Sequence, residues 1–173
     1  MNNKMDWNRL EYRQKELAFS GSIYVRREEE ILLSEAFGYA DISEKILNHP
    51  DTRFSIASGS KIFTSIAICM LAGEGKLDLN SRLADCLDIE FPYFDEAITI
   101  HDLLIHMAGV PDYFDEDEMD DYEDLWQERP MYRMRSPKDF LPMFQYEQME
   151  DAPGSAFKYN NAGYIILGLV IEH

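Results

Sequence analysis

The sequence predicts an α/β fold of the α+β type, in which a helix and two strands precede a series of helices. Two observations support this class. β-branched and aromatic residues crowd residues 22–26 and 31–37, which is typical of strands. Beyond residue 55, apolar residues recur at helical spacing. With 173 residues, 46% of them hydrophobic, the chain is long enough to bury a core.

The N-terminal part is predicted to hold one helix and a pair of strands. Residues 6–17 have an amphipathic pattern and are followed by the stretch FSG. The two strands, 22–26 and 31–37, are joined by a charged turn that lacks the Asn-Gly pair of a tight hairpin. Residues 42–54 are expected to form a polar connection. Because a lone two-stranded hairpin is marginal in water, the strands should have further partners.

The central helix is expected to begin near Ser58 and to end at Gly73 or Gly75. Its apolar positions form a stripe that should face a core. Cys69 lies on this stripe, and we expect Cys69 and Cys86 to be buried free thiols, with a disulfide as the alternative. The stripe consists of Ile62, Phe63, Ile66, Ala67, Met70 and Leu71.

Further helices are predicted along the rest of the chain. A short one covers residues 81–87, and another begins after Thr99 and stops at Gly109. A third begins after a Ser136 cap. Residues 110–130, which lie between them, are expected to be a long irregular excursion. The last helix begins near residue 163, and its apolar residues still recur at helical spacing where the sequence ends.

Charge and hydropathy narrow the classes of function. The net charge of -17 argues against nucleic acid, whose phosphates need a basic surface, and against anionic membranes. No run of about 18 apolar residues predicts a transmembrane helix. The first residues lack the apolar centre of a signal peptide. These features favour a cytoplasmic protein, with a secreted protein whose leader has been removed as the alternative.

Two clusters that suggest metal sites are interpreted as structural. His101 and His106 are five residues apart, which is not the i, i+4 spacing of a zinc pair. The acidic run 115–124 lacks the glycine and the spacing of a calcium loop. It predicts a solvated insertion, with a lid that selects substrates as its functional alternative. We therefore predict no metal and no cofactor.

Ser58 and Lys61 stand three residues apart at the start of the central helix, where the helix dipole disfavours a cation. Residues i and i+3 share a helix face, so Lys61 can approach the Ser58 hydroxyl. A desolvated lysine can accept a proton, and free N–H groups at the helix start favour developing negative charge. The pair is a candidate nucleophile and base. A second Ser-x-x-Lys, Ser155 and Lys158, lies in a turn and is not preferred.

Three segments, in order, resemble the serine β-lactamase-related proteins: class C β-lactamases, penicillin-binding DD-peptidases and their esterase relatives. FSIASGSKIFTSIAICMLAGEGKLDL resembles their nucleophile segment. TIHDLLIHMAGVPDYF resembles the segment that ends in His-x-Ser-Gly-Leu-Pro, with Ala108 in place of the usual serine or threonine. PGSAFKYNNAGYIILGLVIE resembles the Tyr-x-Asn region, with Tyr159 and Asn161 at the matching positions.

The resemblance implies a role for each candidate residue. Ser58 would attack a carbonyl and form an acyl-enzyme. Lys61 and Tyr159 would share the proton transfer, and which of them is the base stays open. Asn161 would hold the substrate amide and help to fix Lys61. The oxyanion hole would use the Ser58 N–H and a donor on a strand beyond residue 173, where a Lys-Thr-Gly type of motif is also expected.

The resemblance also implies an antiparallel sheet flanked by helices, with an inserted helical subdomain. Residues 1–54 would supply the first helix and two strands, residues 55–160 the helical subdomain, and residues 161–173 the start of a returning helix. We expect the remainder of the same fold C-terminal to His173.

The function predicted from the sequence is a serine hydrolase that acts through a covalent acyl-enzyme. Its partner would be a small-molecule or peptide acyl substrate, such as a β-lactam, a D-amino-acid peptide or a small ester. The alternative is a penicillin-binding sensor or scaffold that deacylates slowly or is not catalytic.

Overall fold

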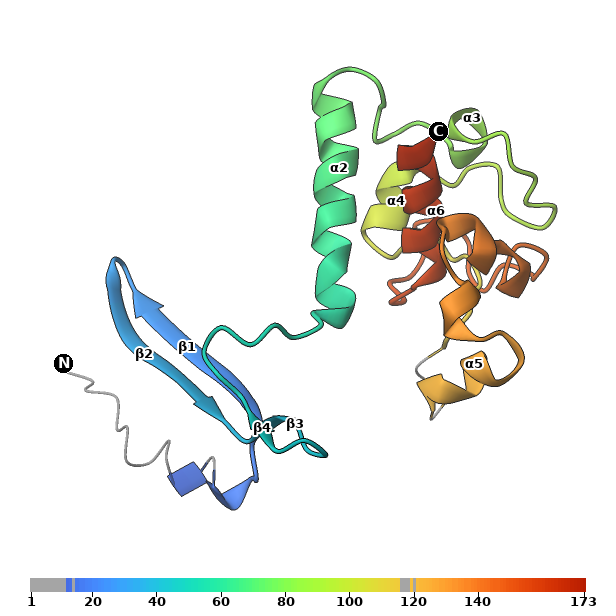
Figure 1. Ribbon diagram of the computed structural model, residues 1–173. Coiled ribbons are helices and arrows are strands. Elements are labelled where there is room, and N and C mark those ends of the chain that lie inside the picture. Colours follow the sequence, from blue (N-terminus) through green and yellow to red (C-terminus); the bar gives the residue numbers. More distant parts are fainter. Residues whose placement is uncertain (1–11, 14, 116–118, 120) are drawn as a thin grey trace. The chain divides into compact units, whose positions relative to one another are not determined.

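The structure, a computed structural model, describes residues 12–13, 15–115, 119 and 121–173. The chain divides into two compact units, Met1–Ile56 and Ala57–His173. Figure 1 shows that the strands belong to the first unit, whereas α2 to α6 belong to the second. Among the described residues, no helix has the length and apolar character needed to cross a lipid bilayer.

The first unit is built on two antiparallel strands, β1 (Gly21–Arg27) and β2 (Glu30–Phe37), which confirms both predicted strands. Glu28, in the turn between them, adopts a φ of 52°, a conformation for which hairpins usually use Asn or Gly. Of the helix predicted at residues 6–17, residues 12, 13, 15 and 16 are helical. Residues 6–11 and 14 lie outside the described residues.

A second hairpin, β3 (Tyr39–Asp41) with β4 (Ile46–Leu47), extends into the segment that was predicted as a polar connection. Its turn is stabilised locally, because Asp41 Oδ1 accepts hydrogen bonds from Ser43 Oγ at 2.7 Å and from the Glu44 N–H at 2.9 Å. These contacts hold the pKa of Asp41 below its usual value. Local hydrogen bonds of a turn carboxylate leave no trace in hydrophobic periodicity, which explains why the sequence pattern does not predict this hairpin.

The second unit is organised around α6 (Ala162–Glu172), at the C-terminal end of the chain in Figure 1. It packs against α2 (Lys61–Gly73), α4 (Ile100–Leu104) and a 3-10 helix, Pro137–Met143. Gly168, where an added Cβ would lie 3.2 Å from Pro137 Cγ, lets the 3-10 helix approach α6. The core that results contains the fully buried side chains of Ile68, Ile98, Ile100, Leu103, Val110, Phe144, Ile166 and Leu167.

The predicted helices of this unit are present with adjusted bounds. Residues 81–87 contain α3 (Leu83–Cys86), and α4 begins after a capping box between Thr99 and Asp102. The helix after Ser136 is 3-10 and not α, since Pro142 inside it has no N–H to donate. The excursion at residues 110–130 was predicted to be irregular but contains α5 (Leu125–Glu128).

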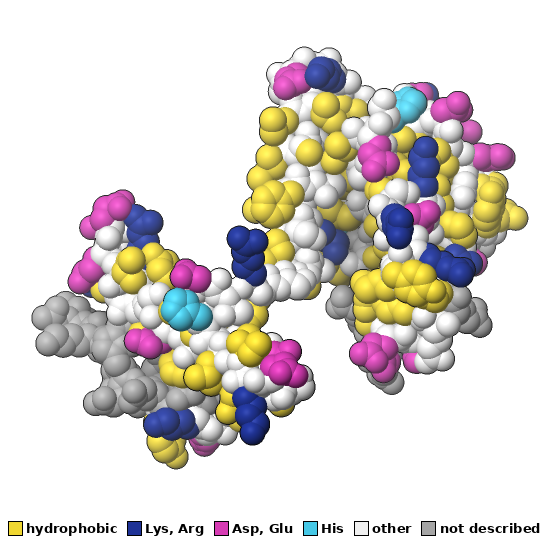
Figure 2. Space-filling view, in the orientation of Figure 1, with side chains coloured by type: hydrophobic (Ala, Val, Ile, Leu, Met, Phe, Trp, Pro, Cys, Tyr) yellow, Lys and Arg dark blue, Asp and Glu magenta, His cyan; other side chains and the backbone are white. Residues whose placement is uncertain are grey.

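The apolar stripe of α2 does not face the core of the helical unit, contrary to the prediction. The side of α2 that meets α6 carries Lys61, Ser65 and the buried Ile68. Cys69 is therefore exposed and Cys86 only partly buried, contrary to the prediction that both are buried, whereas both thiols are free as predicted. Figure 2 shows hydrophobic side chains along α2, where Ile62, Phe63, Ile66 and Met70 have exposed fractions of 59%, 66%, 49% and 60%.

Candidate active site

Ser58 lies in a 3-10 turn, Ala57–Ser60, that runs directly into α2. The residue before it, Ala57, has a φ of 43°, in the left-handed region that residues with a Cβ rarely adopt. Lys61 is the first residue of α2, and its Nζ donates a hydrogen bond of 3.1 Å to Ser58 Oγ. The turn therefore presents the hydroxyl and the amine to each other.

Tyr159 and Asn161 lie in the segment that leads into α6, and they meet the same two side chains. Tyr159 Oη donates to Ser58 Oγ at 2.8 Å. Lys61 Nζ donates to Tyr159 Oη at 2.7 Å and to Asn161 Oδ1 at 2.8 Å. The structure thus brings all four candidate residues into one hydrogen-bonded cluster. The three bonds from Lys61 match the three N–H groups of an ammonium.

Asn160, between these two residues, anchors the segment to the chain that follows α4. This residue is buried, with 7% of its surface exposed. The amide nitrogen donates to the Val110 carbonyl at 2.7 Å, and the amide oxygen accepts from the Gly163 N–H at 2.7 Å. Because both ends of this buried amide are paired, the backbone on either side of Asn160 is held in a fixed place.

Asp112, which the sequence analysis did not single out, orients Asn161. Its carboxylate accepts from the backbone N–H groups of Asn161 at 2.7 Å and Ala162 at 2.9 Å, at the N-terminus of α6. It also accepts from Asn161 Nδ2 at 3.1 Å, so the amide oxygen of Asn161 is turned towards Lys61. Burial raises the pKa of Asp112, and the N–H donors oppose that rise. The only feature of the sequence that could have pointed to Asp112 is its position in segment 99–114, which resembles a family segment.

The two histidines of segment 99–114 have different surroundings, as their spacing predicts. His101 is exposed on α4. The ring of His106 contacts the rings of both Tyr159 and Tyr164, with centroid distances of 4.7 and 5.1 Å. Tyr164 in turn donates to the Leu104 carbonyl at 3.0 Å and shares a 3.0 Å hydrogen bond with Ser65. His106 is therefore part of the wall behind the cluster.

The second Ser-x-x-Lys has no comparable arrangement. Ser155 Oγ donates to the Ala152 carbonyl of its own turn at 2.6 Å. Lys158 Nζ lies 2.7 Å from Asp115 and 2.9 Å from Glu150, and these hydrogen bonds raise its pKa. A lysine that is held charged in this way is a poor proton acceptor. Asp115, the first residue of the acidic run, is thus ion-paired and not simply solvated, whereas residues 116–118 and 120 lie outside the described residues.

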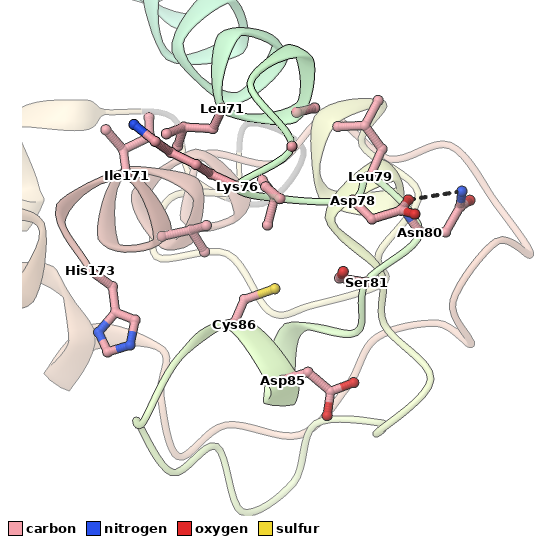
Figure 3. A pocket seen from close by; sticks show the side chains of 14 residues that line it. Leu71, Lys76, Asp78, Leu79, Asn80, Ser81, Asp85, Cys86, Ile171 and His173 are labelled. Atoms are coloured by element: carbon pink, nitrogen blue, oxygen red, sulfur yellow. Dashed lines mark hydrogen bonds between the residues drawn. The ribbon is translucent and has the colours of Figure 1, made fainter.

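A cavity of about 960 Å³ lies at the far end of α2 from Ser58 (Figure 3). Its lining comes from the end of α2, the chain that follows, α3 and the end of α6, and includes Lys76, Ser81, Cys86 and His173. Burial raises the pKa of the Cys86 thiol. A helix of this length spans roughly 20 Å. The cavity is therefore separate from the hydrogen-bonded cluster.

Comparisons with known proteins agree on one family. The Beta-lactamase family model matches residues 11–173. Protein flp of Staphylococcus aureus (strain NCTC 8325 / PS 47) is 31% identical over 160 residues, which cover 88% of this chain and 29% of the relative. Penicillin-binding protein 4* of Bacillus subtilis (strain 168) is 30% identical over 156 residues, which cover 89% of this chain and 32% of the relative.

A solved structure shows the same fold. The penicillin binding protein from Bacillus halodurans matches with a TM-score of 0.87 and 49% identity over 94% of this chain and 49% of that one. The chain thus spans about half of this protein and about a third of the two curated relatives. These matches confirm the predicted β-lactamase/transpeptidase-like α/β fold and the resemblance read from three segments. Since the family model covers almost the whole sequence, the chain belongs to the Beta-lactamase family.

Proposed function

We propose that this chain supplies the nucleophile of a serine hydrolase, in which Ser58 is acylated by an amide or an ester. The triangle formed by Ser58 Oγ, Lys61 Nζ and Tyr159 Oη, with sides of 3.1, 2.7 and 2.8 Å, carries the proposal. Each side is short enough for direct proton transfer. The substrate would be a β-lactam, a D-amino-acid peptide or a small ester, and the penicillin-binding relatives support a β-lactam as the first probe.

In the proposed reaction, Ser58 Oγ forms a bond to the acyl carbon while its proton passes to Lys61 Nζ or Tyr159 Oη. The base must be deprotonated beforehand, as an amine or as a phenolate. The tetrahedral oxyanion would accept from the Ser58 N–H, which lies in the first turn of a helical segment. The C–N or C–O bond then breaks, and the leaving group takes the proton. Water hydrolyses the ester and returns a proton to Ser58 Oγ.

Asn161 is proposed to hold both Lys61 and the substrate amide. A second oxyanion donor and the third motif of the family are proposed to follow His173 in the natural protein. The support for this is that the matched part of the Bacillus halodurans protein is 49% of its chain. Experiments on activity are therefore designed for a full-length protein that includes the polypeptide proposed to follow His173.

The test is labelling of the full-length protein with a fluorescent penicillin, followed by intact-mass spectrometry over time. Ser58→Ala is expected to abolish the adduct and to leave the melting temperature nearly unchanged, because Ser58 is exposed. Ser155→Ala, which alters the second Ser-x-x-Lys, is the matched control and should keep the label.

The time course separates the two functions predicted from the sequence. An adduct that disappears as product accumulates supports the hydrolase, whereas an adduct that persists supports a slowly deacylating penicillin-binding protein. Labelling that survives Ser58→Ala would show that another residue is the nucleophile. Absence of any adduct with penicillin, together with absence of ester hydrolysis, would overturn the proposal.

A further inference from the structure

His106 lies directly behind the phenol of the candidate cluster. It follows α4 with a φ of 59°, in the left-handed region. Its ring is tilted by 37° against Tyr159, is stacked at 29° on Tyr164, and meets the edge of Phe157 at a centroid distance of 6.0 Å. The Tyr159 ring, whose hydroxyl contacts Ser58, therefore rests on the imidazole.

His106 also holds the backbone on both sides of Tyr159. The carbonyl of His106 accepts from the Lys158 N–H at 3.0 Å. Its Nδ1 accepts from the Asn160 N–H at 3.1 Å. The residues before and after Tyr159 are thus bonded to the same histidine, and Asn160 is itself fixed by its buried amide. These two bonds leave the Tyr159 phenol little freedom to move away from Ser58.

We propose that His106 is a positioning residue, which holds Tyr159 against Ser58 and Lys61 only while its imidazole is neutral. An Nδ1 that accepts a hydrogen bond carries no proton, so the ring is in the tautomer protonated at Nε2. A protonated ring would present a second N–H to the Asn160 N–H, and the two donors would repel each other. The inference rests on the role proposed above for Tyr159, and it adds a dependence on pH.

The charges around His106 reinforce this preference. Lys61 Nζ lies 4.9 Å from the centroid of the Tyr159 ring and 5.7 Å from that of Tyr164, and both rings contact the imidazole. Burial and the Lys61 charge both lower the pKa of His106 from its ordinary value, and they outweigh a smaller opposing effect of the Asn160 backbone. Lys158 and Glu150, which line the small cavity beside His106, are paired with each other at 2.9 Å.

The sign of the pH effect follows from the lowered pKa. At neutral pH the ring is neutral, and His106 Nδ1 accepts the hydrogen bond from the Asn160 N–H that holds Tyr159 in place. As the pH falls below 6.5 and through the folded-state pKa of His106, the ring gains a proton and Tyr159 is released. The acylation rate of Ser58 should therefore fall on the acid side, by up to about tenfold per pH unit.

The decisive variant is His106→Asn in the full-length protein. Asn tolerates the left-handed φ, and its Oδ1 stands as many bonds from the backbone as Nδ1 does, so it can accept from Asn160 without titrating. Because Asn keeps the hydrogen bond but lacks the ring that packs against Tyr159, we expect His106→Asn to label more slowly at pH 7.5. The labelling that remains should lack the part of the acid decline that belongs to His106. His101→Asn, at the exposed histidine of the same segment, is the control and should keep the decline.

A second measurement does not depend on activity. The imidazole signals of His106 and the ring signals of Tyr159 are followed by NMR as the pH is lowered. Both sets of signals should change with the same midpoint pH. That midpoint should equal the pH at which the labelling rate falls to half on the acid side. Two results would overturn the inference. One is a decline of the labelling rate at low pH that is unchanged in His106→Asn, and the other is a set of Tyr159 ring signals that do not change when His106 is protonated. Failure of the Ser58 proposal is separate, since it shows at pH 7.5 in Ser58→Ala.

Discussion

At the scale of single residues, the cluster depends on side chains whose partners are far away in the sequence. Ser58 and Lys61 are local to each other, and their spacing together with the resemblance was enough to nominate them. The nominations of Tyr159 and Asn161 came from the resemblance alone. The contacts of Asp112 and His106 with the segment before α6 join residues 49 and 54 positions apart. Neither hydrophobic periodicity nor a short motif can predict contacts between residues this far apart in the sequence.

Asp112 offers a test of how Asn161 is oriented. We expect Asp112→Asn to slow the acylation of Ser58 by up to about a hundredfold, because the new amide can turn a nitrogen towards the Asn161 donors and displace the oxygen that faces Lys61. The unfolding free energy should fall by about 1.5–3 kcal/mol, as for a lost hydrogen bond to a charged group. Labelling rates and chemical denaturation measure the two effects.

The matched control for this change is Asp88→Asn, at an exposed carboxylate. It removes the same charge and should leave both the labelling rate and the denaturation midpoint close to those of the parent protein. A labelling rate in Asp112→Asn equal to that of Asp88→Asn would show that Asn161 is oriented without Asp112.

At the scale of elements, the turn after α4 brings the chain against the segment before α6. Gly109 has a φ of 68°, and a Cβ placed there would overlap the Asp151 carbonyl oxygen. The Gly109 carbonyl also accepts from the Glu150 N–H at 2.9 Å. This close backbone approach brings residues 150–160 alongside the chain that holds His106 and Asp112. It is the element-level reason why the cluster forms.

Gly109→Ala is therefore expected to destabilise the fold by several kcal/mol, through both the overlap and the left-handed φ. Two controls separate these causes. Gly154→Ala has a similar φ of 74° but open space around the new Cβ, so it should cost about 1 kcal/mol. Gly73→Ala, in α2 and also in open space, should stabilise by about 0.5–1 kcal/mol. Thermal melts that rank the three variants otherwise would contradict this account.

The elements themselves were predictable where one pattern dominated. The strands β1 and β2 follow from their β-branched and aromatic residues, and α6 follows from its apolar run. The hairpin β3–β4 was missed because the hydrogen bonds of Asp41 create it. The 3-10 geometry after Ser136 was missed because Pro142 changes the hydrogen-bonding pattern without interrupting the helix.

At the scale of the whole molecule, the apolar stripe of α2 is the largest departure from expectation. Amphipathic spacing predicts that a stripe is covered, but it does not say which part of the fold covers it. In the helical unit, α6 covers a different side of α2, and Phe63 and Met70 stay more than half exposed. Under the proposal that the rest of the fold follows His173, that polypeptide would cover this stripe.

Residues 1–173 alone are consequently expected to lack a cooperative thermal transition by circular dichroism and to bind a dye that reports exposed apolar surface. The comparison is the full-length protein, which should melt cooperatively and bind less dye. A sharp, reversible melt of the 173-residue chain with little dye binding would show that the stripe needs no further cover.

The three hydrogen bonds of Lys61 bear on what this residue can offer a substrate. Because Nζ already donates to Ser58, Tyr159 and Asn161, an incoming ligand gains from the ammonium only by displacing one of them. Loss of a proton from Nζ, by contrast, leaves a lone pair that the Ser58 hydroxyl can satisfy without any rotamer change. Under the proposed function, this lysine is suited to raise the turnover of the enzyme and to leave its affinity for substrate almost unchanged.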